Sequence, residues 1–153
     1  VAALEKEIKA LDVKVHKIYL STPSLAEKKI VLKTIPGIGE ISANQLLALL
    51  PELGTLNRKR IASLAGVAPH PNESGKWTGY RYVRGALGTI KPVLYMAAMA
   101  AARSKSPLGK FYQKLLSAGK KKMVALVALM RKIIVIANAR IRDHEAKALS
   151  SSV

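Results

Sequence analysis

The sequence contains no cysteine and few acidic residues. Among its 153 residues, 9 Asp and Glu stand against 26 Lys and Arg, which gives a formal net charge of +17. The absence of cysteine excludes a disulfide framework and a thiolate zinc site, and it fits an intracellular protein. So large an excess of positive charge predicts a polyanionic partner, above all nucleic acid. A ribosomal or unspecific basic protein is the alternative.

The sequence also lacks a membrane-spanning segment and any strand pattern longer than a few residues. Its most apolar run, from Met123 to Ala139, is interrupted by Arg131 and Lys132 and is therefore expected to be a core helix. Half of the chain is hydrophobic, which is enough to bury a core and excludes a disordered basic tail. We therefore predict an all-α fold and no membrane partner.

The first 22 residues have the spacing of a coiled coil. Apolar residues alternate at intervals of four and three, with charged residues between them, at Leu4, Ile8, Leu11, Val15 and Ile18. We interpret residues 1–22 as the end of a coiled-coil or linker helix. The pattern covers only about two heptads, so an amphipathic helix packed on its own domain is the alternative. Because Val1 opens inside this pattern, we expect a fragment of a longer protein.

A helix-hairpin-helix element is predicted next. Ser21, Thr22 and Pro23 break the first helix, and Ser24 with Glu27 has the spacing of a capping box. A short helix to about Thr34 leads into the sequence IPGIG, at residues 35–39, and a second helix runs from about Glu40 to Leu50.

The hairpin predicts a contact with a nucleic-acid backbone. Glycines allow a tight turn and expose backbone N–H groups at the start of the second helix, where an anion such as phosphate binds. The predicted contacts are Gly37, Ile38 and Gly39, with Ile35 and Ile38 anchoring the hairpin in the core. An ordinary pair of helices without a ligand is the alternative.

Capping residues delimit the remaining helices. Asn57 is the predicted N-cap of a helix closed by Gly66, and Ser106 followed by Pro107 opens a helix that ends near Ser117, before Gly119. A long helix is expected from about Tyr80 to Arg103, with a kink or break at Pro92. The last helix is expected from about Lys121 to Asp143, followed by a disordered tail over residues 146–153.

The stretch from Val67 to Gly79 is the most informative loop. It is too long for a plain connection between helices, and such loops are usually functional. Ser74 lies at its centre, beside Gly75, which lets the backbone approach a ligand. The cations that follow it, and that we expect to bind phosphate, are Lys76, Arg81, Arg84 and, further on, Lys91.

The chemistry of this loop has two interpretations. A serine framed by glycine and cations is suited to attack on a phosphodiester, with the cations stabilising the developing charge. It also suits a passive phosphate clamp or a turn-forming Ser-Gly pair. Glu73 and His70 are the only nearby groups that could accept the serine proton, and neither is convincing. Trp77 could stack on a base or anchor the loop.

Several segments in a fixed order resemble a known family. They are IPGIG, ASLAGVAP, the SG of PNESG, GYRYVRGALG, LYMAAMAAAR, LGKFYQKLLSAGK and ALVALMRKIIVIANARIRD. Together they resemble the C-terminal transposase domain of the Piv/MooV-type insertion-sequence transposases, the group of insertion sequences one-ten, one-sixteen and nine-oh-two. The resemblance covers about Ile30 to Asp143, and we assign residues 23–145 to this domain.

The resemblance implies a DNA recombinase that acts on double-stranded DNA. Family members carry an N-terminal domain similar to RuvC-type resolvases, whose DEDD carboxylates hold Mg²⁺. Their C-terminal serine becomes covalently linked to DNA, and that serine matches Ser74. Many members are guided by a bridge RNA. No metal site is expected in these 153 residues, because no set of four carboxylates can be found in them.

The resemblance also predicts the setting of this chain. Strand exchange would need the missing Mg²⁺-binding domain, so the isolated chain is expected to be inactive. The full-length protein is expected to be a homo-oligomer in the prokaryotic cytoplasm, associated with the nucleoid. The alternative function is a non-catalytic helix-hairpin-helix module that binds DNA or RNA.

Overall fold

The computed structural model describes residues 1–68 and 86–152, and these residues are helical without any strand. This confirms the all-α prediction. In chain order the elements are α1 (Ala2–Ser21), α2 (Pro23–Lys33), α3 (Glu40–Leu49), α4 (Arg58–Leu64), a 3-10 turn (Ala86–Thr89), α5 (Ile90–Arg103), α6 (Pro107–Ser117) and α7 (Lys122–Ser150).

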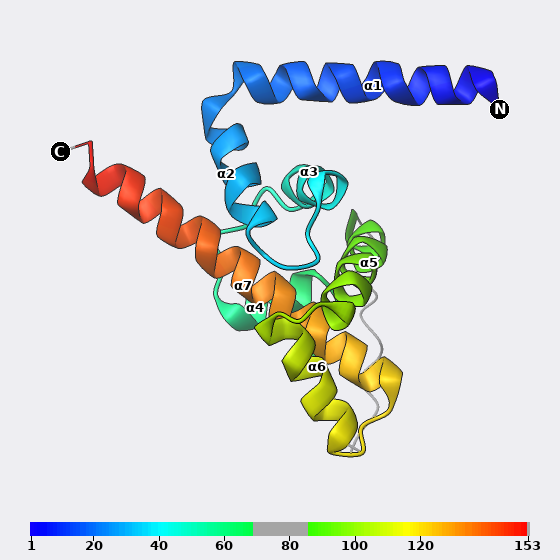
Figure 1. The fold of residues 1–153 in the computed structure, drawn as a ribbon. Helices are drawn as coiled ribbons and strands as arrows, with labels where there is room; N and C mark the ends of the chain where they lie inside the picture. The colour runs from blue at the N-terminus through cyan, green and yellow to red at the C-terminus, as the bar shows by residue number, and fades with distance from the viewer. Residues whose placement is uncertain (69–85, 153) are drawn as a thin grey trace, which may run out of the picture.

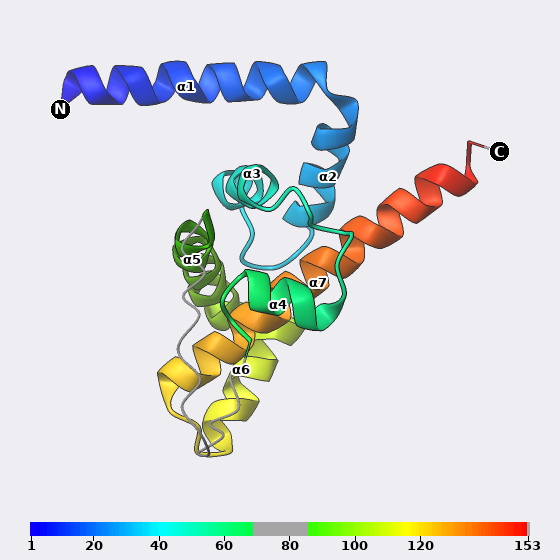
Figure 2. The ribbon, with the colours of Figure 1, turned by 180° about the vertical axis from the view of Figure 1, so that it is seen from behind.

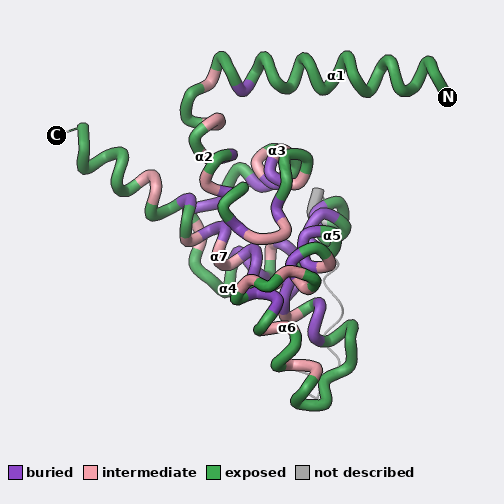
Figure 3. Tube along the Cα trace, viewed as in Figure 1, coloured by how far each residue is buried: buried purple, intermediate pink, exposed green. Residues whose placement is uncertain are grey.

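Helix α7 forms the axis of the fold. It packs against α2, α4, α5 and α6, and its buried residues lie between Ala125 and Ile141, while both of its ends are exposed (Figures 1 and 3). Its buried face repeats at helical spacing, with Leu129, Ile133 and Ile134, Ala137 and Ile141 all fully buried. Alanines on α5 at Ala97, Ala98 and Ala101 are buried too, and their small side chains allow close approach of neighbouring backbone.

Helix α1 projects away from this body. Figures 1 and 2 show it extending from the top of α2, against which it packs at its C-terminal end. Its apolar stripe is exposed, with relative exposures of 36–65 % from Leu4 to Ile18. The stripe therefore does not pack on the other described residues of this chain. A coiled coil with another helix stays a prediction.

The helix boundaries set by local capping are confirmed. The Asn57 side chain accepts a hydrogen bond from the backbone N–H of Arg60 at 2.9 Å, and the Ser106 hydroxyl accepts one from Gly109 at 3.3 Å. Gly66 and Gly119 follow their helices with φ values of +68° and +79°. These left-handed conformations suit glycine, which has no Cβ.

Two expected helices differ from the prediction within the described residues. Helix α2 begins one residue before Ser24, at Pro23, and its N-cap Thr22 makes no side-chain capping bond, so the Ser24–Glu27 capping box does not form. Helix α5 begins at Ile90 and the 3-10 turn Ala86–Thr89 precedes it, so the expected long α-helix is interrupted there, while residues 80–85 of that expected helix lie outside the described residues. Pro92 therefore lies in the first turn, where a helix needs no N–H donor, and it does not kink the helix.

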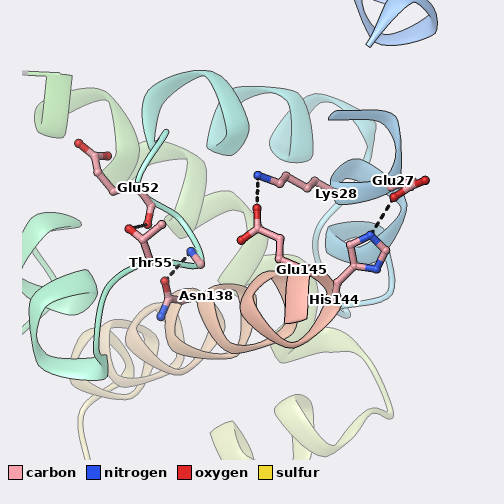
Figure 4. A network of polar contacts seen from close by, with 8 residues as sticks. Glu27, Lys28, Glu52, Thr55, Asn138, His144 and Glu145 are labelled. Atoms are coloured by element: carbon pink, nitrogen blue, oxygen red, sulfur yellow. Dashed lines mark hydrogen bonds and ion pairs between the residues drawn. The ribbon is translucent and has the colours of Figure 1, made fainter. Parts of the chain in front are cut away.

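The expected disordered tail is also corrected. Helix α7 continues past Asp143 to Ser150, so residues 146–150 are helical. Residues 145–149 are Glu, Ala, Lys, Ala and Leu, all of which favour helix. The helix is also held to α2, because Glu145 pairs with Lys28 at 2.5 Å and His144 contacts Glu27 at 3.1 Å (Figure 4).

None of the helices in the described ranges is long and apolar enough to cross a membrane. The same ranges hold no group of three or more His, Asp or Glu side chains arranged to hold a metal ion.

Candidate nucleic-acid interface

The hairpin between α2 and α3 is anchored as the sequence predicted. Ile35 and Ile38 are 1 % and 5 % exposed and belong to the hydrophobic core. Their backbone N–H groups are both used inside the turn, since Ile35 donates to Leu32 and Ile38 donates to Ile35, each at 3.0 Å. The N–H of Ile38 is therefore not free for a phosphate in this structure.

The two glycines of the hairpin have different surroundings. Gly37 has a φ of +94°, and a Cβ built on it would overlap the carbonyl oxygen of Ala97 on α5. Gly39 is exposed and has an extended backbone with φ of −95°, and a Cβ added to it would meet no atom within 4 Å. Of the three predicted hairpin contacts, Gly39 is the one with open space beside its backbone.

Gly39 is also the N-cap of α3, so the free N–H groups of the first helical turn follow it. The first helical residue is Glu40, whose carboxylate forms ion pairs with Lys29 and, at 2.8 Å, with Lys33, both on α2. The hydrogen bonds from Lys29 and Lys33 lower the pKa of Glu40 to about 2. The negatively charged carboxylate of Glu40 therefore lies at the N-terminus of α3, where it interacts favourably with the helix dipole.

Lys29 links the hairpin to α1. Only 9 % of this residue is exposed, and its ammonium group lies over the Tyr19 ring, 4.6 Å from the centroid. Burial raises the pKa of the Tyr19 hydroxyl, and the negative charge of Glu40 raises it further. Lys29 is thus a structural cation at the junction of α1, α2 and α3, with little surface to offer to a ligand.

Lys91 lies beside the residue at which the chain enters the Ser74 loop. It is exposed in the first turn of α5, and its side chain passes beside Gly66, because a Cβ on Gly66 would meet Lys91 Cε at 2.9 Å and Nζ at 3.7 Å. Gly66 closes α4 and precedes the loop. This position suits the predicted phosphate contact of Lys91, which stays a prediction.

Most of the predicted catalytic site lies outside the described residues. This applies to Ser74 and Gly75, to the cations Lys76, Arg81 and Arg84, and to His70, Glu73 and Trp77. Their roles stay predictions from the sequence and the family resemblance.

The structure shows a separation of charge that the sequence reading missed. No described residue between Glu52 and Asp143 is acidic, although this part of the chain carries many cations. The described acidic residues lie on α1, α2, the start of α3, the turn after α3 and the last turns of α7. The acid-free half consists of α4, α5, α6 and the first two thirds of α7, and its cations include Arg58, Lys59, Arg60, Arg103, Lys105, Lys110, Lys120, Lys121, Lys122, Arg131 and Lys132. The signal was available in the sequence as a long run in which only Glu73 is acidic.

The sequence is similar to known transposase-family proteins. Residues 30–113 match the family model described as Transposase IS116/IS110/IS902 family. The pilin gene-inverting protein of Moraxella lacunata is 30% identical over 141 residues, covering 90% of this chain and 44% of that protein. An IS116 protein of Streptomyces clavuligerus is 30% identical over 147 residues, covering 92% of this chain and 35% of that protein.

The chain thus spans less than half the length of these relatives. The family match covers more than half of the chain and includes the hairpin, the Ser74 loop, α5 and part of α6. The chain therefore belongs to the IS116/IS110/IS902 family of transposases.

Proposed function

We propose that this chain is the DNA-binding, serine-bearing part of a transposase that exchanges strands of double-stranded DNA. Family membership carries the proposal, and one relative is a pilin gene-inverting protein. The acid-free half of the molecule supports it, because a surface of cations without carboxylates attracts the phosphate backbone and does not repel it.

Ser74 is the proposed nucleophile. Its hydroxyl oxygen forms a bond to the DNA phosphorus, the bond from phosphorus to the leaving sugar oxygen breaks, and the serine proton is passed to a base while the leaving oxygen takes up a proton. The resulting ester keeps the energy of the broken phosphodiester, so the strands are resealed without ATP. Lys76, Arg81 and Arg84 are the proposed partners of the phosphate, with Lys91 at the edge of the loop.

The described residues do not fit a magnesium site, since they hold no cluster of carboxylates. Mg²⁺ is proposed to be held by a RuvC-like DEDD domain of the same protein, and strand exchange by Ser74 would need that domain. A bridge RNA is proposed as the guide, and the place of action is the prokaryotic cytoplasm at the nucleoid.

Helix α1 is the proposed self-association element of the full-length protein. Its five stripe residues keep the coiled-coil spacing along one continuous helix, and all five are exposed. A second copy of the same helix would bury this stripe, which accounts for the expected homo-oligomer.

The test compares Ser74→Ala with Ser117→Ala in the full-length protein. Ser117 is an exposed serine at the end of α6 whose hydroxyl donates to the Gln113 carbonyl oxygen at 3.0 Å. We expect Ser74→Ala to abolish strand exchange and the protein–DNA adduct, while DNA affinity changes only a few-fold, because a neutral hydroxyl contributes about 0.5–1.5 kcal/mol. Ser117→Ala should retain both strand exchange and formation of the protein–DNA adduct.

Mass spectrometry of the trapped adduct identifies the linked residue. An adduct on a residue other than Ser74, or normal recombination by Ser74→Ala, would contradict the assignment. Normal recombination would instead favour the second candidate function, a non-catalytic helix-hairpin-helix module that binds DNA or RNA.

A further inference from the structure

The corner between α5 and α6 forms a basic pocket whose occupant the proposed function does not specify. The pocket has a volume of about 790 Å³ and opens between the last turns of α5 and the first turns of α6. Its cations are Arg103, Lys105 and Lys110, and none of its described lining residues is acidic. These cations are exposed, and none of them has an ion-pair partner among the described residues.

The corner is held in one shape by a chain of hydrogen bonds. The Ser104 hydroxyl donates to the Ala101 carbonyl oxygen at 2.7 Å, and the Ser104 and Ser106 hydroxyl oxygens are 2.6 Å apart. Because Ser104 uses its only proton on Ala101, Ser106 donates to Ser104. The Ser106 oxygen in turn accepts from the N–H of Gly109, which caps α6.

Gly109 fixes how closely the two helices meet. It is buried, and a Cβ built on it would overlap the carbonyl oxygen of Ser104. The chain can therefore turn from α5 into α6 within three residues only because position 109 has no side chain. The cations on both sides of the corner are consequently carried by a preorganised frame, which reduces the entropy lost on binding.

The remaining walls of the pocket suit a base as well as a phosphate. Tyr112 and Met99 are partly buried against the core and line the pocket with apolar surface. Gln113 is exposed beside them and offers an amide that both donates and accepts. An aromatic ring for stacking combined with cations for the backbone is the pattern by which proteins hold single-stranded nucleic acid.

We propose that this pocket binds an unpaired nucleotide of a nucleic-acid strand, with Arg103, Lys105 and Lys110 on its phosphates and Tyr112 against its base. The inference rests on the proposed function in one respect, namely that the protein works on nucleic acid. An unpaired base can enter a recess of this size. A paired base is held in the stack of the duplex, so a duplex presents mainly its backbone phosphates to the pocket.

The experiment compares two triple variants that remove the same charge. The pocket variant is Arg103→Gln, Lys105→Gln and Lys110→Gln, and the control variant is Lys6→Gln, Lys9→Gln and Lys17→Gln on the exposed surface of α1. Fluorescence anisotropy measures binding of single-stranded DNA, single-stranded RNA and duplex DNA of one sequence across a salt series. Circular dichroism confirms that each variant is folded.

The pocket variant should bind single strands at least about tenfold more weakly than the control variant. The slope of log K against log salt should fall in magnitude by about 2, which corresponds to ~0.7 for each of three lost phosphate contacts. Duplex binding should differ less between the two variants. Weaker binding of both single-stranded DNA and single-stranded RNA, or of RNA alone, supports the proposed nucleotide pocket. The comparison of the two strands shows whether the pocket accepts either strand or only RNA.

A second pair of variants tests the base contact. Tyr112→Leu should weaken single-strand binding, whereas Tyr95→Leu, at an exposed tyrosine of α5 outside the pocket, should not. Two results would overturn the proposal that the pocket binds an unpaired nucleotide while leaving the proposed function intact. One is an equal loss of affinity in the two triple variants, and the other is a loss of duplex affinity as large as the loss of single-strand affinity. A wild-type chain that binds no nucleic acid would contradict both.

Discussion

The backbone of Gly37 lies directly against Ala97 in the middle of α5. A Cβ on Gly37 would overlap the Ala97 carbonyl oxygen and approach the Ala101 Cβ to 3.0 Å. The hairpin that was predicted as a phosphate contact is therefore also a packing surface against α5. Helix α3 packs on α5, so this close approach connects the two.

Gly37→Ala should destabilise the fold strongly. The substitution forces a Cβ into a left-handed conformation and into backbone that cannot move aside, at a cost of about 1–2 kcal/mol for the conformation and about 1–3 kcal/mol for the overlap. Gly39→Ala is the matched control, because its φ of −95° and open surroundings accept a Cβ. Urea unfolding of both variants measures the difference, and equal stabilities would contradict the packing role.

Gly39→Val tests the hairpin as a ligand site without disturbing the fold. A branched side chain beside the first N–H groups of α3 should weaken nucleic-acid binding by a similar factor for every sequence, since backbone N–H groups contact phosphates and not bases. Anisotropy titrations with duplexes of unrelated sequence measure this loss of affinity. Unchanged affinity in a variant with wild-type circular dichroism would show that the hairpin is an ordinary helical turn.

Asn138 supplies the buried polar contact that holds the loop after α3 onto α7. Its Oδ1 accepts from the Gly54 N–H at 2.7 Å (Figure 4). Its Nδ2 donates to the Leu56 carbonyl oxygen at 2.6 Å, and the residue is 2 % exposed. Asn138→Ala should cost about 2–4 kcal/mol, because both backbone groups lose their partner. Gln45→Ala, at an exposed amide on α3, should change stability by less than about 0.5 kcal/mol. A similar effect of both substitutions in urea unfolding would refute this role.

Glu40 should make stability depend on pH in the acid range. Its pKa is lowered to about 2 from 4.5, so its stabilising contribution is present above pH 4.5 and is lost as the pH falls towards 2. Because Glu40 is half exposed, the contribution is expected to be at most about 1 kcal/mol. The difference in unfolding free energy between wild type and Glu40→Gln should shrink over this range.

Glu7→Gln is the control for that measurement. It removes the same charge from α1 at a residue without an ion pair in the described ranges. A stability difference between wild type and Glu40→Gln that stays constant from pH 7 to pH 2 would show that the pairs with Lys29 and Lys33 do not stabilise the fold.

The apolar stripe of α1 should control self-association. Leu11 and Val13 are both 57 % exposed, but only Leu11 lies on the stripe with Ile8 and Val15. Leu11→Gln should therefore shift the protein towards monomer in sedimentation velocity, whereas Val13→Gln should leave its oligomeric state unchanged. A monomeric wild type, or equal effects of the two substitutions, would count against a coiled coil between copies.

The sequence alone determined the features that depend on neighbouring residues. Asn57 and Ser106 cap the helices that follow them, and Gly66 and Gly119 end the preceding ones, because these bonds and φ values are set within about four residues. The apolar periodicity likewise predicted an all-helical fold, and the order of segments indicated the family.

Only the tertiary structure decided what depends on partners far along the chain. Gly37 contacts Ala97, and Asn138 contacts Gly54, although these residues are far apart in the sequence. No pattern in the neighbouring sequence predicts either contact. Helix α7 extends to Ser150, and the ion pair between Glu145 and Lys28 of α2 stabilises its last turns, so the expected frayed end does not begin at residue 146. The basic pocket likewise exists because Gly109 lets α6 turn back closely beside the end of α5, which brings cations from both helices around one recess.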